Sequence, residues 1–354
     1  MFHTLTLNPS LDYLVFAKEF VPGALNRADS ARLFAGGKGV NVALMLHRLG
    51  QPARALGFLA GETGRALQRM LAAEGLPEDF LFLPSGATRV NLKLETPAAS
   101  TELNAPGPAP DPAALAALEA QLAAIPAGDT LIAAGSLPPG LAPDTCARLL
   151  APCAARGVRC VLDTSGPALA AGLAARPWLI KPNLDELAEL TGLAKKGAAL
   201  WADDTPTPPP PGTEQKAAAG GEGQEPPAAR AFAGKAAGPG PFAPLRAALR
   251  AAQRLGAQNV LASLGGQGAA LLTETGEFFY QPAPAGRPVN PAGAGDSLLA
   301  GFLAGLARAA APADALRLGV AAGSATAFCP WLAAAEDVQR LRDALAKAGT
   351  SAPA

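Results

Sequence analysis

The chain has 354 residues and a formal net charge of zero, since 29 Lys and Arg balance 29 Asp and Glu. This neutral balance gives no electrostatic footprint for a nucleic acid or an anionic membrane, and we expect neither as a partner. Hydrophobic residues make up 49% of the chain, enough for the core of one large α/β domain or two ordinary ones. With two histidines and four cysteines that form no C-x-x-C pair, a metal site built on His or Cys ligands is not expected.

Strand and helix patterns alternate along the chain. In order, the sequence predicts a strand at Thr4–Leu7, helices at Lys38–Leu49 and Arg65–Ala73 that end before glycines, and a half-exposed strand at Val90–Leu94. Four apolar strands then each run into a polar or Gly-containing turn, namely Thr130–Ala134, Val158–Leu162, Trp178–Ile180 and Asn259–Ala262. This pattern is typical of a mostly parallel sheet with helices on both faces, which binds ligands at the carboxyl ends of its strands.

Two kinds of segment depart from this alternation. Residues 11–35 and 88–104 are extended and polar with few helix signals, which predicts a small second sheet lying as a lid over the mouth of the first. Residues 201–244 hold ten prolines and seven glycines but no Leu, Ile, Val or Met, so they cannot bury enough apolar surface to offset the entropy of ordering. We expect a flexible surface insertion, a low-complexity expansion rather than a partner-binding tail, within a single domain over residues 1–354.

Neither export nor membrane insertion is expected. The first ten residues show no basic stretch followed by an apolar segment, as a signal peptide would. The longest uncharged run, Leu318 to Ala335, contains Gly319, Gly323 and Pro330, which favours a buried helix over a membrane span. A chain of this size does not depend on disulfides, so we expect four free cysteines in a cytoplasmic protein.

The motif Gly293-Ala294-Gly295-Asp296, followed by the apolar helix Leu298–Leu306, combines an anion site with a carboxylate. A Gly-x-Gly turn that enters a helix exposes several backbone N–H groups at the positive end of that helix. A carboxylate next to a bound phosphate is unfavourable unless it has a task, such as accepting the proton of an attacking hydroxyl. Taken alone, the motif is explained at least as well by an acidic residue that merely stabilises the first helical turn.

A second set of motifs offers positive charge. Gly37-Lys38-Gly39 opens a helix, and is either a site where an anion approaches the backbone or a plain helix entry. Arg89, Asn91 and Lys93 alternate with apolar residues and therefore share one face of a strand. That face is either solvated or, together with Lys38, a cation cluster for one phosphate dianion.

Two turns at strand ends complete the set. Asn183 and Glu186 have the spacing of a capping box, which is a sufficient structural explanation for both residues. The turn from Ser263 to Gly268 either cradles phosphates or simply joins two strands.

Taken together and in this order, the motifs resemble those of the ribokinase-like (PfkB) carbohydrate kinases, and within them the bacterial hexose-phosphate kinases. The similarity runs from about Thr4 to Phe328, interrupted only by the Pro/Gly-rich insertion. The matching stretches are Thr6–Pro9 with Asp12, Ala35–Asn41, Thr88–Lys93, Thr101–Pro108, Gly135–Gly140, Leu162–Gly166, Lys181–Asn183, Ser263–Gly265 and Gly293–Asp296.

The resemblance implies a three-layer α/β/α domain with a β-sheet lid that also makes a homodimer contact. It implies transfer of the γ-phosphoryl group of ATP, with Mg²⁺, to a hydroxyl of a sugar phosphate. Asp296 would be the catalytic base, and the N–H groups of Gly293, Ala294 and Gly295 would form the anion hole. The implied sugar-binding residues are Asp12, Gly37, Asn41 and Ser136, with Lys38, Arg89 and Lys93 on the substrate's phosphate; the implied nucleotide residues are Lys181, Asn183, Ser263, Gly265, Gly268 and Ser324, with Glu186 helping to hold Mg²⁺.

The basic residues favour a phosphorylated substrate, because a kinase of neutral sugars has no use for a second cation cluster. Relatives that act on fructose 6-phosphate often have Gly in place of Lys38 and no basic residue in place of Lys93. We therefore expect fructose 1-phosphate to be converted to fructose 1,6-bisphosphate. Fructose 6-phosphate or tagatose 6-phosphate as substrate, and a non-catalytic sugar-phosphate sensor, stay as alternatives, and a kinase of unphosphorylated sugars or nucleosides is disfavoured.

Two positions depart from the family pattern. Pro291 precedes the Gly-Ala-Gly-Asp motif where relatives commonly carry a hydroxyl residue, and it fixes the approach of the loop. Cys329-Pro330-Trp331 replaces the Gly-Thr of many relatives near the nucleotide. These departures leave the closure of the loop and the nucleotide preference open.

Overall fold

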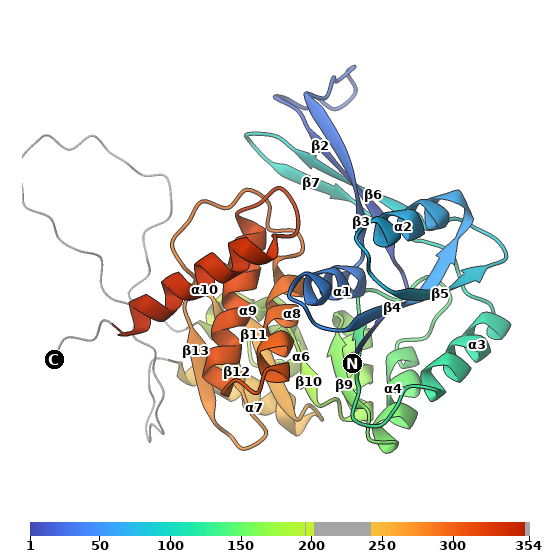
Figure 1. Cartoon of the computed structure of the whole chain (residues 1–354). Coiled ribbons are helices and arrows are strands. Elements are labelled where there is room, and N and C mark those ends of the chain that lie inside the picture. Colours follow the sequence, from blue (N-terminus) through green and yellow to red (C-terminus); the bar gives the residue numbers. More distant parts are fainter. Residues whose placement is uncertain (195, 202–241, 351–354) are drawn as a thin grey trace, which may run out of the picture. The chain divides into compact units, whose positions relative to one another are not determined.

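The computed structural model describes residues 1–194, 196–201 and 242–350 (Figure 1). These residues belong to two compact units. Unit 1 consists of Met1–Pro182 with Gln253–Val260, and unit 2 of Asn183–Ala252 with Leu261–Ala354. Most of the predicted insertion, residues 202–241, lies outside the described residues.

Nine strands form the main sheet, in the hydrogen-bonded order β13-β12-β11-β10-β9-β8-β1-β4-β5. All pairings from β11 to β5 are parallel, whereas β12 and β13 are antiparallel. The predicted mostly parallel α/β fold is thus confirmed. The strands are β1 (Phe2–Thr6), β4 (Ala53–Ala60), β5 (Glu78–Leu83), β8 (Thr130–Ala134), β9 (Arg159–Asp163), β10 (Leu179–Ile180), β11 (Asn259–Ser263), β12 (Ala269–Leu272) and β13 (Phe278–Gln281).

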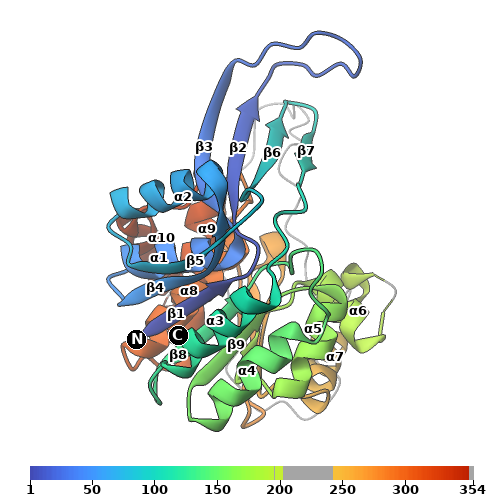
Figure 2. The same cartoon turned by 90° about the vertical axis from the view of Figure 1, so that its right-hand side faces the viewer.

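Helices cover both faces of the sheet in unit 1. Figure 2 shows α1 and α2 on one side of β1 and β8, and α3, α4 and α5 on the other. These helices bury apolar stripes, such as Leu44, Met45 and Leu46 of α1, and each fully buried side chain of this size contributes about 1.5–3 kcal/mol. Their bounds are α1 (Lys38–Arg48), α2 (Gly61–Ala73), α3 (Pro112–Ala123), α4 (Thr145–Ala155) and α5 (Gly166–Gly172).

The second sheet has four strands in the order β3-β2-β6-β7 and comes from the two ranges in which the sequence predicts it. Its strands are β2 (Ser10–Phe16), β3 (Ser30–Gly36), β6 (Arg89–Glu95) and β7 (Ser100–Leu103), and β2 and β6 are parallel. In most sheets the apolar face is buried and the polar face is exposed, and this sheet shows the opposite pattern. Polar side chains such as Asp12, Asn91 and Lys93 are buried, while Tyr13 and Leu103 on the opposite face are exposed. Buried polar groups need partners, so this inverted pattern marks the polar face as a site.

Unit 2 is organised around two closely packed helices, α8 (Ala294–Ala307) and α9 (Pro312–Ala327). Glycines on both helices allow the close approach: a Cβ at Gly301 would lie 2.7 Å from Leu318 O, and one at Gly319 would lie 2.8 Å from Leu298 O. The other helices assigned mainly to this unit are α6 (Leu184–Thr191), α7 (Ala243–Arg254) and α10 (Ala335–Thr350), which contacts α9 (Figure 1).

The predicted long helix over Leu318–Ala335 is shorter than expected, since α9 ends at Ala327 and the chain turns before α10. The turn is held by side chains, because Asn290 Nδ2 donates to Pro330 O at 2.9 Å and Ala333 N donates to Thr326 Oγ1 at 3.2 Å. Across the described ranges, we find no helix with the length and hydropathy needed to cross a bilayer.

The residues directly before and after residues 202–241 pack together in an aromatic cluster. The rings of Trp201 and Phe242 lie 5.6 Å apart, centroid to centroid, and both contact Tyr280 on β13, at 5.6 and 4.8 Å. The guanidinium of Arg246 stacks 4.3 Å above the neighbouring ring of Phe278. Because the two flanking residues touch, a short connection can replace the segment between them.

We therefore expect that replacing residues 202–241 by a short Gly/Ser linker leaves the fold intact. Shortening the connection about eightfold removes about three doublings of loop length, which stabilises the chain by roughly 2 kcal/mol or less. Phe242→Ala, in contrast, should destabilise unit 2 by about 3–5 kcal/mol, because this ring is buried in the cluster. Urea unfolding of the two variants tests this, and a strongly destabilised linker variant would contradict it.

Candidate active site

A buried carboxylate in unit 1 joins two of the predicted lysines. Asp163 ends β9 with no exposed surface; its Oδ1 accepts from Lys38 Nζ at 3.0 Å, and its Oδ2 forms an ion pair with Lys181 Nζ at 3.2 Å. Burial alone would raise the pKa of Asp163, but the ammonium groups of Lys181 and Lys38 outweigh it and hold the pKa below its ordinary range. Lys38 begins α1 and Lys181 follows β10, so Asp163 connects the start of a helix to the end of a strand.

The start of α1 lies against the end of β1. Gly37 has φ of 102°, a conformation that favours glycine, and a Cβ there would lie 3.1 Å from Pro9 Cα. No side chain of the described residues caps the helix and its first turn carries no acid, so the positive end of the helix is available to an anion. Asn41, one turn into α1, is buried and donates its backbone N–H to Gly37 O at 2.9 Å.

Arg89 at the start of β6 is tied to backbone carbonyls. Its guanidinium donates to Asn8 O at 3.0 Å, to Ala105 O at 3.2 Å and to Ser136 Oγ at 3.4 Å. Burial lowers the pKa of Arg89, and the nearby Asp12 carboxylate opposes this shift. Arg89 therefore contributes a positive charge that no carboxylate in the described residues neutralises by direct contact.

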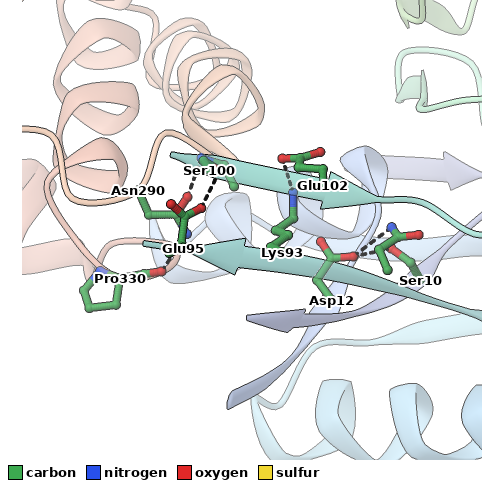
Figure 3. A network of polar contacts seen from close by, with 10 residues as sticks. Ser10, Asp12, Lys93, Glu95, Ser100, Glu102, Asn290 and Pro330 are labelled. Atoms are coloured by element: carbon green, nitrogen blue, oxygen red, sulfur yellow. Dashed lines mark hydrogen bonds and ion pairs between the residues drawn. The ribbon is translucent and has the colours of Figure 1, made fainter. Parts of the chain in front are cut away.

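Lys93, two residues along the same strand, is paired with an acid. Its Nζ donates to Glu102 Oε1 at 2.8 Å across the β6–β7 ladder, in which the two residues face each other (Figure 3). The hydrogen bond from Lys93 lowers the pKa of the Glu102 carboxyl despite its partial burial. Asp12 lies on the same buried face as Lys93 and accepts hydrogen bonds from Ser10 and Asn91.

The three cationic residues predicted from the sequence thus all have partners in the structure. Lys38 shares Asp163 with Lys181, Lys93 is neutralised by Glu102, and Arg89 is held by carbonyls. Ser136 connects to this group through Arg89 and through Asn8 Nδ2, at 3.4 Å from each. An incoming phosphate would meet Arg89 as a fixed donor and would have to share the lysines with their acids.

The Gly-Ala-Gly-Asp motif of unit 2 forms the start of α8. Gly293 adopts φ of 77° as the residue before the helix, no side-chain cap is present there, and Asp296 is buried in the first turn. The N–H of Ala294 donates to Pro291 O at 3.1 Å, so one of the three predicted anion-hole donors is engaged within the loop. Pro291 therefore shapes the loop through its carbonyl, and Asn290 Oδ1 supports it by accepting from Ala292 N at 2.9 Å.

The predicted nucleotide residues of unit 2 lie on neighbouring strand ends. Asn183 and Ser263 form a parallel bridge, and Asn183 and Glu186 form the complete capping box of α6, with bonds of 2.8 and 2.9 Å. The turn with Gly265 and Gly268 is closed by Leu264 N donating to Gly268 O at 2.9 Å. Ser324 lies on α9, next to Gly323, where a Cβ would lie 3.0 Å from Ala294 O.

Sequence reasoning missed several residues that organise this site. Asp163, Asn8, Ser10 and Glu102 all bond to predicted site residues, yet none was assigned a role, and Asn91 was placed on the candidate phosphate-binding face without its bond to Asp12. Asp163 could have been found by the same signal as the other strand-end residues, because it is a polar residue that directly follows a run of apolar strand residues. Asn91 had a signal too, because it shares a strand face with Arg89 and Lys93.

Comparison with known proteins gives the family. The family model described as pfkB family carbohydrate kinase matches residues 6–207 and 229–336. The chain belongs to this family. The PfkB chain is 35% identical to a 1-phosphofructokinase of Bacillus subtilis over 341 residues, 96% of this chain and 97% of the relative. It is 31% identical to a D-tagatose-1-phosphate kinase of Bacillus licheniformis, over 96% of both chains.

Solved structures agree with the fold. The crystal structure of phosphofructokinase-2 from Escherichia coli in complex with substrates and products has a TM-score of 0.80 to this PfkB chain, with 29% identity over 97% of this chain and 99% of that one. The PfkB chain is therefore a phosphotransferase with an alcohol group as acceptor.

Proposed function

We propose that the protein transfers the γ-phosphoryl group of ATP to the 6-hydroxyl of fructose 1-phosphate and so makes fructose 1,6-bisphosphate. The observation that carries the proposal is the polar face of the second sheet, where register places Asp12 of β2 and Arg89 of β6 on the same side of neighbouring strands. A carboxylate suits sugar hydroxyls and an arginine suits a phosphate, so this face matches a sugar phosphate. The similarity to 1-phosphofructokinases supports this substrate.

In the proposed reaction, Asp296 accepts the proton of the attacking hydroxyl. The oxygen of that hydroxyl bonds to the γ-phosphorus, the bond from the γ-phosphorus to the β,γ-bridging oxygen breaks, and ADP leaves. The N-terminus of α8 stabilises the charge on the transferred group through its N–H groups and dipole. No histidine is needed, because phosphoryl transfer depends mainly on positioning and on charge stabilisation.

Mg²⁺ fits this site as an ion that would bind together with the phosphates of ATP. The described residues contain no group of three or more His, Cys, Asp or Glu that could hold a metal by itself. Mg²⁺ is typically bound by one or two carboxylates together with substrate phosphates, and Glu186 at the start of α6 is the carboxylate we assign to it. The ion would neutralise charge on the nucleotide phosphates.

The proposal is tested by measuring ADP release with MgATP and, in parallel, fructose 1-phosphate, tagatose 1-phosphate, fructose 6-phosphate, tagatose 6-phosphate and free fructose. We expect the highest kcat/KM with fructose 1-phosphate. Preference for tagatose 1-phosphate would support a second candidate, for which the B. licheniformis relative provides the observation. Binding of sugar phosphates without ADP release would instead make the protein a sensor.

We further propose that the protein is a homodimer through the second sheet. Leu33, Tyr13, Leu92 and Leu103 stand in one register row across all four strands, on the face opposite Asp12. Leu103 is 68% exposed and Tyr13 41%, an apolar row that a soluble monomer would leave in water. A second copy supplies an equal row, as a two-fold interface requires. The related phosphofructokinase-2 of E. coli has been solved in a tetrameric form.

Leu103→Asp should therefore shift the protein from dimer to monomer, because it places a charge within an apolar contact. Sedimentation velocity measures the change. Leu193→Asp is the matched control, since Leu193 is 54% exposed in unit 2 and should leave the dimer intact. A wild-type protein that sediments as a monomer at micromolar concentration would contradict the dimer.

The four cysteines of the chain are free. Burial raises the pKa of Cys146 to about 11 and that of Cys160 to about 12, which keeps these thiols protonated and unreactive. We infer a cytoplasmic enzyme, because free thiols are typical of proteins in a reducing compartment.

A further inference from the structure

Two donors converge on one oxygen of Asp12. Ser10 Oγ donates to Asp12 Oδ1 at 2.8 Å, and Asn91 Nδ2 donates to the same oxygen at 3.0 Å (Figure 3). Ser10 precedes Asp12 by two residues on β2 and so lies on the same face, and Asn91 is the register partner of Asp12 on β6. All three side chains are at least nine-tenths buried.

The amide of Asn91 is fixed in orientation by a second bond. Its Oδ1 accepts from the backbone N–H of Ala105 at 3.2 Å, while its Nδ2 faces the carboxylate. A flipped amide would place two oxygens against each other and leave the Ala105 N–H without an acceptor. Ala105 in turn accepts from Arg89 through its carbonyl at 3.2 Å, so Asn91 links Asp12 to the residue that holds Arg89.

The carboxyl group of Asp12 lies against the backbone of Gly36. A Cβ at residue 36 would lie 2.6 Å from Oδ2 and 2.8 Å from Oδ1, so any side chain there would collide with the carboxylate. With both bonds of Asp12 within the described residues on Oδ1, Oδ2 is the oxygen that can accept from a sugar hydroxyl.

We propose that Asn91, assisted by Ser10, is a positioning residue that holds Oδ1 of Asp12 and so leaves Oδ2 to accept a hydrogen bond from a hydroxyl of the sugar phosphate. The inference rests on the proposed function, because it assumes that Asp12 binds the sugar. It predicts that Asn91 acts on substrate affinity through the charge of Asp12. If Asn91 only stabilised the second sheet, the effect of its replacement on KM would not depend on the charge of Asp12.

Asn91→Asp tests this directly. The new carboxylate can still accept from Ala105 N, but its other oxygen faces Asp12 Oδ1 at about 3 Å, so the two carboxyl groups share a proton and titrate as a pair with a raised apparent pKa. The charged groups on the same face are Arg89 and Lys93 of β6 and Glu102 of β7, which is paired with Lys93, while β3 places Phe34 and Gly36 beside Asp12.

We expect the KM of Asn91→Asp for fructose 1-phosphate to change by about tenfold or more between about pH 5.5 and pH 8.5, one unit of pKa coupling being tenfold, while kcat follows the wild-type profile. Asn91→Leu is the matched control. It removes the same donor without adding a titrating group, so its KM should rise by roughly tenfold at every pH.

Ser10→Ala provides an independent readout that does not involve the Asn91 variants. It removes the other donor from Oδ1 and should raise KM several-fold with kcat unchanged, and thermal unfolding shows whether each variant is folded. A folded Asn91→Asp protein whose KM has the pH dependence of the wild type overturns the inference, as does a Ser10→Ala protein with an unchanged KM. A wild-type protein that phosphorylates none of the sugar phosphates overturns the proposed function instead.

Discussion

Asp296→Asn should reduce turnover by roughly 10²–10⁴-fold, the range that a positioned general base contributes. The variant keeps the shape and hydrogen-bonding capacity of the side chain but cannot take the proton of the attacking hydroxyl. Asp296 is buried in the first turn of α8, and loss of its charge beside the helix dipole should cost no more than about 1 kcal/mol of stability. ATP binding, measured by calorimetry, should therefore persist.

Asp314→Asn is the matched control for this prediction. Asp314 also lies in the first turn of a helix, α9, but it is exposed and paired only with Arg317 one turn later in the described structure. Its replacement should leave ADP release unchanged. Turnover of Asp296→Asn within about tenfold of the wild type would remove Asp296 as the base, because a bystander acid would give that result.

Asp163→Asn should destabilise unit 1 by about 3–5 kcal/mol, because it removes the shared partner of two ammonium groups and leaves the buried Lys181 without its counter-charge. Glu74→Gln is the control, since the exposed pair of Glu74 with Arg48 should contribute less than about 1 kcal/mol. Urea unfolding of both variants measures the contrast. Equal, small effects would mean that the two lysines do not depend on Asp163.

The free energy that Asp163 contributes to folding should also decrease as the pH is lowered. Its pKa is held below the ordinary Asp value, so the native state favours the charged form and the stabilisation is fully present above that value. It is lost as pH falls below about 4 and through the lower native pKa. The stability difference between wild type and Asp163→Asn should therefore be constant near neutrality and narrow in acid.

The sequence predicted the regular elements well where apolar runs end at glycine. The helix predicted at Lys38–Leu49 is α1 at Lys38–Arg48, and the strand predicted at Thr130–Ala134 is β8 with the same bounds. The run Leu318–Ala335 failed as one helix, because hydropathy alone does not show that Pro330 and the bonds of Asn290 and Thr326 turn the chain. Hydropathy reports burial, and it does not report what ends a helix.

The candidate site was harder to predict because its partners are distant in sequence. Lys38 and its acid, Asp163, are 125 positions apart, and Asn91 and Asp12 are 79 apart. Motif reading identified which residues carry charge, but it could not show which of those charges are already balanced. Only strand register pairs Lys93 with Glu102, and register depends on the whole sheet.

The tight contact between α8 and α9 restricts how this alanine-rich chain can vary. Replacement of glycine by alanine adds a single methyl group and is tolerated on most helices, where it even favours the helical state. At Gly301 and Gly319 that methyl group would meet a carbonyl oxygen of the neighbouring helix at less than 3 Å. Among natural variants, we expect alanine to accumulate on outer helices such as α3 and to be eliminated by selection at these two positions.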